Sequence, residues 1–192
     1  MKVPQLALIG VVAGAGLALG TAANGEFVDN GDGTSTFSLS WDSAEIYGDG
    51  MIYGAVETYA AAAGAEVLAV GWEDLTVSTD NPLVPYNGDN FWGLFNVTGP
   101  GGSGWYYGVP FAGESASDLG PSSGGFNLEG AGFSVNADGS IGVGYADVGG
   151  AGEVVTGYLT GSVIVVVAGS IPSPGALALL GLAGLTGMRR RR

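Results

Sequence analysis

Glycine punctuates the interior of this chain, and that pattern constrains the fold more than any other feature. Most of its 38 glycines lie between Asn24 and Ile171, separated by short runs in which apolar and polar residues alternate. Glycine supplies the positive φ that tight turns need, and alternation with a period of two is typical of half-buried strands. The interior therefore predicts an all-β fold, namely a single antiparallel β-sandwich of jelly-roll-like type.

Two turns connect runs that have strand periodicity. The turn Asp29-Asn30-Gly31-Asp32-Gly33 joins Phe27-Val28 to residues 36–41, and the turn at residues 136–139 joins residues 133–135 to residues 141–145. Asn-Gly and Asp-Gly pairs favour hairpin turns, so both segments are expected to be β-hairpins. Further strands are expected at residues 66–72, 75–79, 91–97, 105–111 and 153–167.

The other interior segments carry less regular signals. Val163 to Val167 is a continuous β-branched run, which predicts a central strand covered on both faces. Residues 99–104 and 113–125 are rich in Gly, Ser and Pro and are expected to form long loops. Residues 56–64 contain four consecutive alanines and suit a short helix or a strand, of which the alternation from Ile52 to Ala60 favours the strand.

Charge divides the chain into three parts. All five basic residues are Lys2 and Arg189 to Arg192, whereas all 18 acids lie between Glu26 and Glu153, so the interior has a formal charge of −18. Such an interior cannot neutralise phosphates, which excludes nucleic acid as a partner, and anionic lipid surfaces would repel it. It forms no side-chain salt bridge of its own, so burial and backbone hydrogen bonds must stabilise it.

Missing residue types exclude most enzyme chemistry. The chain has no Cys and no His, and its interior has no Lys, which removes thiolate, triad, Schiff-base and the usual zinc chemistries. Two carboxylates suffice for glycoside hydrolysis, but nothing marks a pair among acids such as Glu73-Asp74, Glu114 and Glu129. As neighbours in a strand, Glu73 and Asp74 are expected to point to opposite faces. We therefore expect no enzyme.

The N-terminus predicts export. Met1-Lys2 supplies a positive start, an apolar run extends from Val3 to Gly20, and small residues follow to Ala23. This is the layout of a secretory signal peptide, so residues 1–23 are expected to be removed and residues 24–170 to form the mature acidic domain. An uncleaved membrane helix is the alternative, and the glycines of the segment disfavour it.

The C-terminus predicts a second membrane signal. Pro172, Ser173, Pro174 and Gly175 precede an apolar run from Ala176 to Met188, and Arg189, Arg190, Arg191 and Arg192 close the chain. Arginines remain on the cytoplasmic face of a membrane. The apolar run would make a helix of about 20 Å, shorter than the hydrocarbon core of about 30 Å. It therefore suits a transient signal better than a permanent anchor.

The order of these features resembles the PEP-CTERM sorting signal, over residues 171–192. That signal consists of a Pro-Glu-Pro-type motif, a hydrophobic helix and an Arg-rich end, and Ser173 stands here where the usual motif has Glu. The resemblance implies a secreted bacterial surface protein that is transiently anchored by its C-terminal helix and then processed by an exosortase-like enzyme. A plain tail anchor is the alternative.

Two kinds of binding site can be drawn from the interior. Calcium is the one cofactor for which candidates exist, because no basic side chain competes for the loop carboxylates of Asp29, Asp32, Asp80 and Asp89. The turn that contains Asp29 and Asp32 lacks the ligand spacing of an EF-hand, and a capped hairpin turn is the plainer interpretation.

Aromatic residues supply the other candidate site. Trp92, Trp105, Tyr106 and Tyr107 lie in expected strands, and rings of this kind stack on the C–H faces of sugars. In an alternating strand, however, one of every two neighbouring aromatics normally faces the core. Core packing and glycan binding are therefore both open for this group.

These observations combine into one expectation. The protein is expected to be exported to the cell envelope, the cell surface or the extracellular polysaccharide matrix, in a structural or adhesive role. Secretion machinery, an exosortase-like enzyme and extracellular polysaccharide are the expected partners, and membrane contact is expected only through the terminal signals. The alternative is a carbohydrate-binding module, with a carboxylate glycosidase a distant third.

Overall fold

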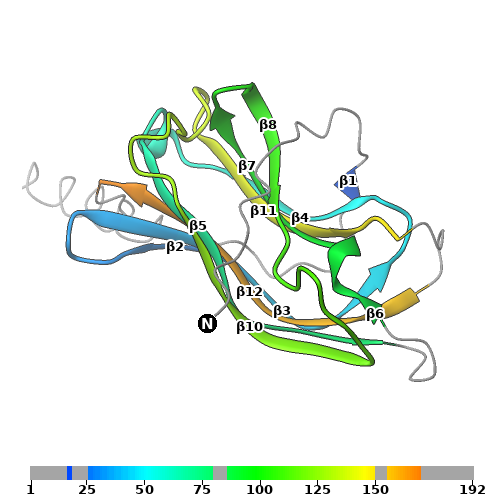
Figure 1. Cartoon of the computed structure of the whole chain (residues 1–192). Coiled ribbons are helices and arrows are strands. Elements are labelled where there is room, and N and C mark those ends of the chain that lie inside the picture. The colour runs from blue at the N-terminus through cyan, green and yellow to red at the C-terminus, as the bar shows by residue number, and fades with distance from the viewer. Residues whose placement is uncertain (1–16, 19–25, 80–85, 150–154, 170–192) are drawn as a thin grey trace, which may run out of the picture.

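The computed structural model describes residues 17–18, 26–79, 86–149 and 155–169 (Figure 1). Strands dominate these residues, and the only helices among them are two short 3-10 turns, η1 (Ala60–Ala62) and η2 (Gly88–Asn90). The predicted all-β class is therefore confirmed. Both terminal signals lie outside the described residues, except for the two residues of β1 (Leu17–Ala18).

The strands form two five-stranded sheets and one small ribbon. Sheet A contains, in spatial order, β1, β4 (Ile52–Thr58), β11 (Ser140–Asp147), β7 (Phe91–Gly99) and β8 (Gly102–Gly108). Sheet B contains β10 (Asp118–Asn127), β5 (Val67–Thr79), β12 (Val155–Ala168), β3 (Thr34–Tyr47) and β2 (Glu26–Asp29). The ribbon pairs β6 (Tyr86–Asn87) with β9 (Ser115–Ala116). Among the described strands, only β1 and β4 pair in parallel.

The long strands pair in a nested order. β3 pairs with β12, β4 with β11, β5 with β10, and β7 with β8, all antiparallel. In each of these four pairs an earlier strand meets a later one, and the separation in sequence becomes smaller from β3–β12 to β7–β8. Most of these contacts are long-range, so hairpin signals in the sequence reveal few of them.

Side chains of the two sheets meet in one apolar core. Trp41 of β3 packs edge-on against Tyr145 of β11, with ring centroids 5.3 Å apart, and the Tyr145 hydroxyl donates to the Glu45 carbonyl at 2.8 Å. Phe27 of β2 packs edge-on against Tyr59, which follows β4, at 4.4 Å. Burial of each such side chain contributes about 1.5–3 kcal/mol. Because the interior of the chain has no basic residues, this core and the hydrogen bonds between strands stabilise the fold without ion pairs.

A line of irregular residues crosses sheet B. Ser43 in β3, Asp74 in β5, Gly120 in β10 and Gly161 in β12 all have positive φ, at 57°, 49°, 94° and 113°. The ladders of β12 with β3, β12 with β5 and β10 with β5 each shift register at this level. β-Bulges bend strands and increase their twist, and the long strands of sheet B curve in Figure 1.

The bulge explains an error about Glu73 and Asp74. Alternation places them on opposite faces, yet both side chains are exposed. Asp74 has φ 49°, and its backbone N–H donates to Ser123 Oγ at 2.9 Å instead of continuing the strand pattern. One strand, β5, runs through both segments expected at 66–72 and 75–79.

Both segments expected to be long loops contain strand residues. β10 (residues 118–127) begins inside the expected loop 113–125 and extends two residues beyond it, because Phe126 packs edge-on against Trp72 at 5.7 Å and so ties this Gly- and Ser-rich segment to β5. In the other segment, Gly99 ends β7 and Gly102 begins β8, so residues 100–101 alone form the turn between the two strands. These tertiary contacts override local propensity.

Other expectations are confirmed in part. β4 ends at Thr58, and three of the four alanines form η1, so both interpretations of residues 56–64 are partly right. β12 is central in sheet B, but Ile164 and Val166 are only half-buried on its outer side, whereas Val163 and Val165 are buried. Ser134 forms isolated bridges with Glu66 and Thr98, and residues 133–135 do not form the expected hairpin with β11.

Candidate functional site

Three of the four aromatic candidates lie together on the outer face of sheet A, the face that points away from the shared core. Alternation along β7 and β8 directs Trp92, Trp105 and Tyr107 outward, and all three are half-buried. The fourth, Tyr106, points inward: it is 6 % exposed and packs edge-on against Phe133 at 5.1 Å. Tyr106 therefore belongs to the core and not to this group.

The three outward rings form a patch with an apolar base. Trp92 and Tyr107 stack nearly parallel, with centroids 4.3 Å apart and planes 12° apart. Leu94, Ile52 and Ala146 are buried beneath the three aromatic side chains on the same face. In this stack each ring covers one face of the other and leaves the opposite face uncovered by its partner. We call Trp92, Trp105 and Tyr107 the aromatic patch.

A hydrogen-bonded amide and hydroxyl group adjoins the patch. Asn136 is 7 % exposed; its Nδ2 donates to Asn96 Oδ1 at 2.8 Å and to Ser140 Oγ at 3.1 Å. Thr98 Oγ1 donates to Asn136 Oδ1 at 2.8 Å and shares a 2.7 Å hydrogen bond with Ser103 Oγ. Asn96 stands directly opposite Trp105 in the β7–β8 ladder. The outer face thus joins aromatic rings to fixed neutral polar groups.

Sequence reasoning missed this polar group. Asn96 follows Trp92 by four residues, so the alternation of β7 alone places both on one face. That signal was available. Asn136 gave no such signal, because only the folded chain brings the turn before β11 next to β7.

The calcium candidates do not converge. Asp29 Oδ1 accepts the Gly31 N–H at 2.9 Å, and Asp32 Oδ1 accepts the Thr34 N–H at 3.0 Å, within the β2–β3 turn. Asp89 Oδ1 accepts the Gly113 N–H at 2.7 Å elsewhere in the fold. Asp80 lies outside the described residues. Within the described ranges no three acidic side chains are grouped so as to hold a metal ion.

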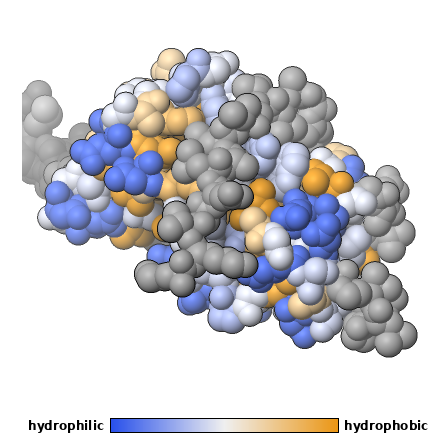
Figure 2. Space-filling model, viewed as in Figure 1, coloured by the Kyte–Doolittle hydropathy of each residue, from blue (hydrophilic) through white to orange (hydrophobic). Residues whose placement is uncertain are grey.

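The β2–β3 turn forms a polar end of the molecule. Figure 2 shows hydrophilic residues gathered over this hairpin, at the left of the view. Asp32 has a lowered pKa because its carboxylate accepts hydrogen bonds from the Thr34 hydroxyl and backbone N–H. Asp138 has the same arrangement with Ser140, and its pKa is lowered for the same reason. These carboxylates cap turns.

A second aromatic group is built from tyrosines. Tyr53 stacks on Tyr47 and on Tyr145 at 5.6 Å each. The Tyr53 hydroxyl donates to Asp49 Oδ2 at 2.6 Å, and the Tyr47 hydroxyl donates to Glu45. Burial, followed by the hydrogen bond to Asp49, raises the Tyr53 pKa. These carboxylates bind tyrosine hydroxyls, so the group is structural.

One acid is buried near a tyrosine. Asp147 is 3 % exposed and accepts hydrogen bonds from the Gly149 N–H at 2.7 Å and the Thr156 hydroxyl at 2.8 Å. The Tyr86 hydroxyl is buried without a hydrogen bond among the described atoms, and its pKa is raised first by burial and then by the Asp147 charge. The carboxylate ties β11 to β12.

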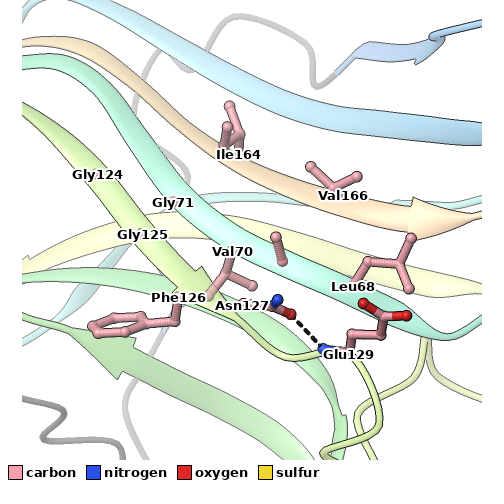
Figure 3. A pocket seen from close by; sticks show the side chains of 11 residues that line it. Leu68, Val70, Gly71, Gly124, Gly125, Phe126, Asn127, Glu129, Ile164 and Val166 are labelled. Atoms are coloured by element: carbon pink, nitrogen blue, oxygen red, sulfur yellow. Dashed lines mark hydrogen bonds between the residues drawn. The ribbon is translucent and has the colours of Figure 1, made fainter.

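The outer face of sheet B contains a shallow apolar groove of about 440 Å³ (Figure 3). Gly71 and Gly125 leave its floor without side chains, and Leu68, Ile164 and Val166 line its sides. Figure 3 shows Glu129 and Asn127 at one end, where Asn127 Oδ1 accepts the Glu129 N–H at 2.9 Å. The aromatic side chain among the residues that line this groove is Phe126, which is buried.

No family model, no curated protein and no solved structure matches the chain. The sorting residues Pro172, Ser173, Pro174, Gly175 and Arg189 to Arg192 lie outside the described residues. In the described part of the chain, no helix has the length and apolarity needed to span a bilayer.

Proposed function

We propose that this protein is an exported, surface-sorted structural or adhesive protein of the bacterial cell envelope or extracellular polysaccharide matrix. The observation that carries the proposal is the segregation of charge: every basic residue lies in the two terminal segments, and all 18 acids lie between them. Basic residues at both ends, each beside an apolar run, suit two membrane signals flanking an acidic exported body. An exosortase-like enzyme would process residues 171–192.

We further infer that the body is a jelly-roll β-sandwich. The nested pairing of β3 with β12, β4 with β11, β5 with β10 and β7 with β8 supports it, because rolling one long antiparallel hairpin into two Greek keys gives this order. The shared core of Trp41, Tyr145 and their neighbours supports the face-to-face packing of a sandwich. Such a body needs no disulfide for export.

Intact mass of the protein recovered from its host tests the sorting proposal. The expected mature species lacks residues 1–23 and roughly the last twenty residues, and it leaves the membrane fraction. A control chain with Arg189 to Arg192 each replaced by Gln should stay uncleaved at its C-terminus. A native species that keeps the four arginines and remains in the membrane would contradict exosortase-type processing and indicate a tail anchor.

The second candidate function is carbohydrate binding, and the aromatic patch favours it. Trp92, Trp105 and Tyr107 stand on a single sheet face beside Asn96 and its hydrogen-bonded partners. Rings that present a face to solvent stack on the C–H groups of sugars, and fixed amides orient the hydroxyls. An adhesive matrix protein and a carbohydrate-binding module are compatible functions of one domain.

A polysaccharide pull-down tests this second candidate. Replacing Trp92 and Trp105 together by Ala should remove binding, whereas Tyr158→Ala, which removes a half-buried ring from sheet B, should leave it unchanged. Binding that survives loss of both tryptophans would contradict a role for the aromatic patch.

A further inference from the structure

The outer face of sheet A carries no charged side chain on its four long strands. The outward positions of β4, β7, β8 and β11 hold only glycine, alanine, aliphatic, aromatic, hydroxyl and amide residues. The acids in these strands are Glu57 and Asp147, which pair with Ile141 and Phe91 and so share the inward parity of those core residues. This absence is notable in a body of charge −18.

Glycines occupy the centre of this face, and Gly54, Gly142 and Gly144 are all buried. Gly144 lies between Gly54 and Leu94 in the ladders, and Gly142 lies between Val56 and Asn96. A Cβ at Gly142 would lie 2.9 Å from Val56 Cγ2 and 3.1 Å from Asn96 Cβ. Val56 and Asn96 therefore pack closely on either side of Gly142, and the accessible side chains here are Val56, Asn96 and the half-buried rings of the aromatic patch.

The polar groups of this face are neutral and already oriented. Asn96 Oδ1 accepts a hydrogen bond from Asn136, so the Asn96 Nδ2 group is the donor turned away from that partner. Trp105 stands across from Asn96 in the ladder. At a rise of about 3.3 Å per residue, Trp105 and Tyr107 are about 6.6 Å apart along β8. One neutral donor and two ring positions thus lie close together on this face.

Electrostatics distinguishes between classes of polysaccharide. An anionic chain would approach a body with 18 acids and no basic residue, so it would be repelled unless cations intervened. An uncharged chain meets no such repulsion, and its hydroxyls suit neutral amides. We propose that the outer face of sheet A binds an uncharged polysaccharide and needs no divalent cation to do so. This inference rests on the second candidate function.

Affinity electrophoresis of the full chain, held in a sugar-free detergent, tests the proposal. The gels contain neutral polymers (laminarin, hydroxyethyl cellulose, mannan) or anionic ones (alginate, polygalacturonate), each with calcium or with chelator. We expect at least one neutral polymer to retard the protein equally with calcium and with chelator, and anionic polymers to have no effect.

Two matched single-residue variants test the location of the site even if the double tryptophan variant fails to fold. Asn96→Asp replaces the donor on the proposed face with a negative charge and should weaken neutral-polymer binding about tenfold, as loss of one hydrogen bond to a ligand does. Asn127→Asp makes the same change on an exposed residue of sheet B and should leave binding unchanged.

Three outcomes would count against the proposal. Retardation by anionic polymers alone, or only with calcium, would overturn the inference, and sensitivity to Trp92→Ala would then still uphold carbohydrate binding. Equal effects of Asn96→Asp and Asn127→Asp would overturn the location of the site. No retardation by any polymer would overturn carbohydrate binding itself.

Discussion

The outer faces of sheets A and B present different kinds of side chain, although both belong to five-stranded sheets. Sheet A presents Trp92, Trp105 and Tyr107 beside an amide network and has no charged outward residue on its long strands. Sheet B presents hydroxyls such as Ser40 and Ser162, which share a 2.7 Å hydrogen bond, together with exposed acids at its bend. Alternation makes both inner faces apolar, so the inner faces explain folding, and the two outer faces differ in the side chains that they present.

The largest expected effect is a difference in stability between two variants of β8, one at the inward Tyr106 and one at the outward Tyr107. Tyr106→Ala should cost about 3–5 kcal/mol in free energy of unfolding, because it leaves a cavity beside Phe133 and Phe95. Tyr107→Ala should cost about 1–2 kcal/mol, since it removes only a half-buried ring stacked on Trp92. Urea denaturation measures both. Equal losses would mean that the aromatic patch is core and would erase the difference between the faces.

The next effect concerns the bend of sheet B, where the ladders shift register, whereas the described ladders of sheet A show no such shift. At Gly161, with φ 113°, a Cβ would lie 2.6 Å from the Asp74 carbonyl oxygen, so Gly161→Ala should cost about 3 kcal/mol through backbone strain and overpacking. Gly102, with φ 102°, has open space at that position, so Gly102→Ala should cost about 1 kcal/mol. Thermal unfolding measures the stability of both variants. Equal stability of Gly161→Ala and Gly102→Ala would contradict the explanation that a side chain at Gly161 clashes with the backbone at the bend.

A smaller effect compares the polar groups of the two faces. Asn136→Ala should cost about 2 kcal/mol, because Asn96 and Thr98 then lose their partner in a nearly buried site. Ser162→Ala should change stability by about 0.5 kcal/mol or less, because its bond to Ser40 is exposed. The urea concentrations at the midpoints of unfolding measure both losses of stability. A larger loss of stability in Ser162→Ala than in Asn136→Ala would contradict the stronger contribution of the polar group beside sheet A.

The smallest effect is the pH response of two similar turns, one in each sheet. The folded-state pKa values of Asp32 and Asp138 lie below the ordinary value, so each carboxylate stabilises the fold fully above about pH 4. That contribution is lost as the pH falls through the lowered pKa. Asp32→Asn and Asp138→Asn should each flatten the fall in urea midpoint between pH 5 and pH 2. Variants with the slope of the unchanged protein would contradict turn capping.

Sequence alone predicts the local parts of this fold. Glycine punctuation and alternation predict the all-β class, and the Asp29 to Gly33 turn connects two strands as expected. Alternation also implies that Tyr106 and its neighbours face opposite ways. These features depend on the backbone geometry of a few consecutive residues, which sequence patterns describe well.

The parts of the fold that depend on contacts between residues far apart in the sequence could not be predicted, for a physical reason. β10 is a strand because Phe126 meets Trp72, and the amide network exists because Asn136 meets Asn96. Each contact joins residues far apart in the chain, and no local pattern encodes the register between them. The candidate site depends on such contacts, so its aromatic half could be foreseen and its polar half could not.

The indole N–H signals of the four tryptophans test the central claim most directly. Trp92 and Trp105 lie on the outer face of sheet A, whereas Trp41 and Trp72 are 7 % and 5 % exposed in the core. We expect titration of the isotopically labelled protein with a neutral oligosaccharide, followed by NMR, to shift the Trp92 and Trp105 signals and leave the other two in place. If a neutral oligosaccharide that binds leaves both outer signals unmoved, the outer face of sheet A is not the binding site.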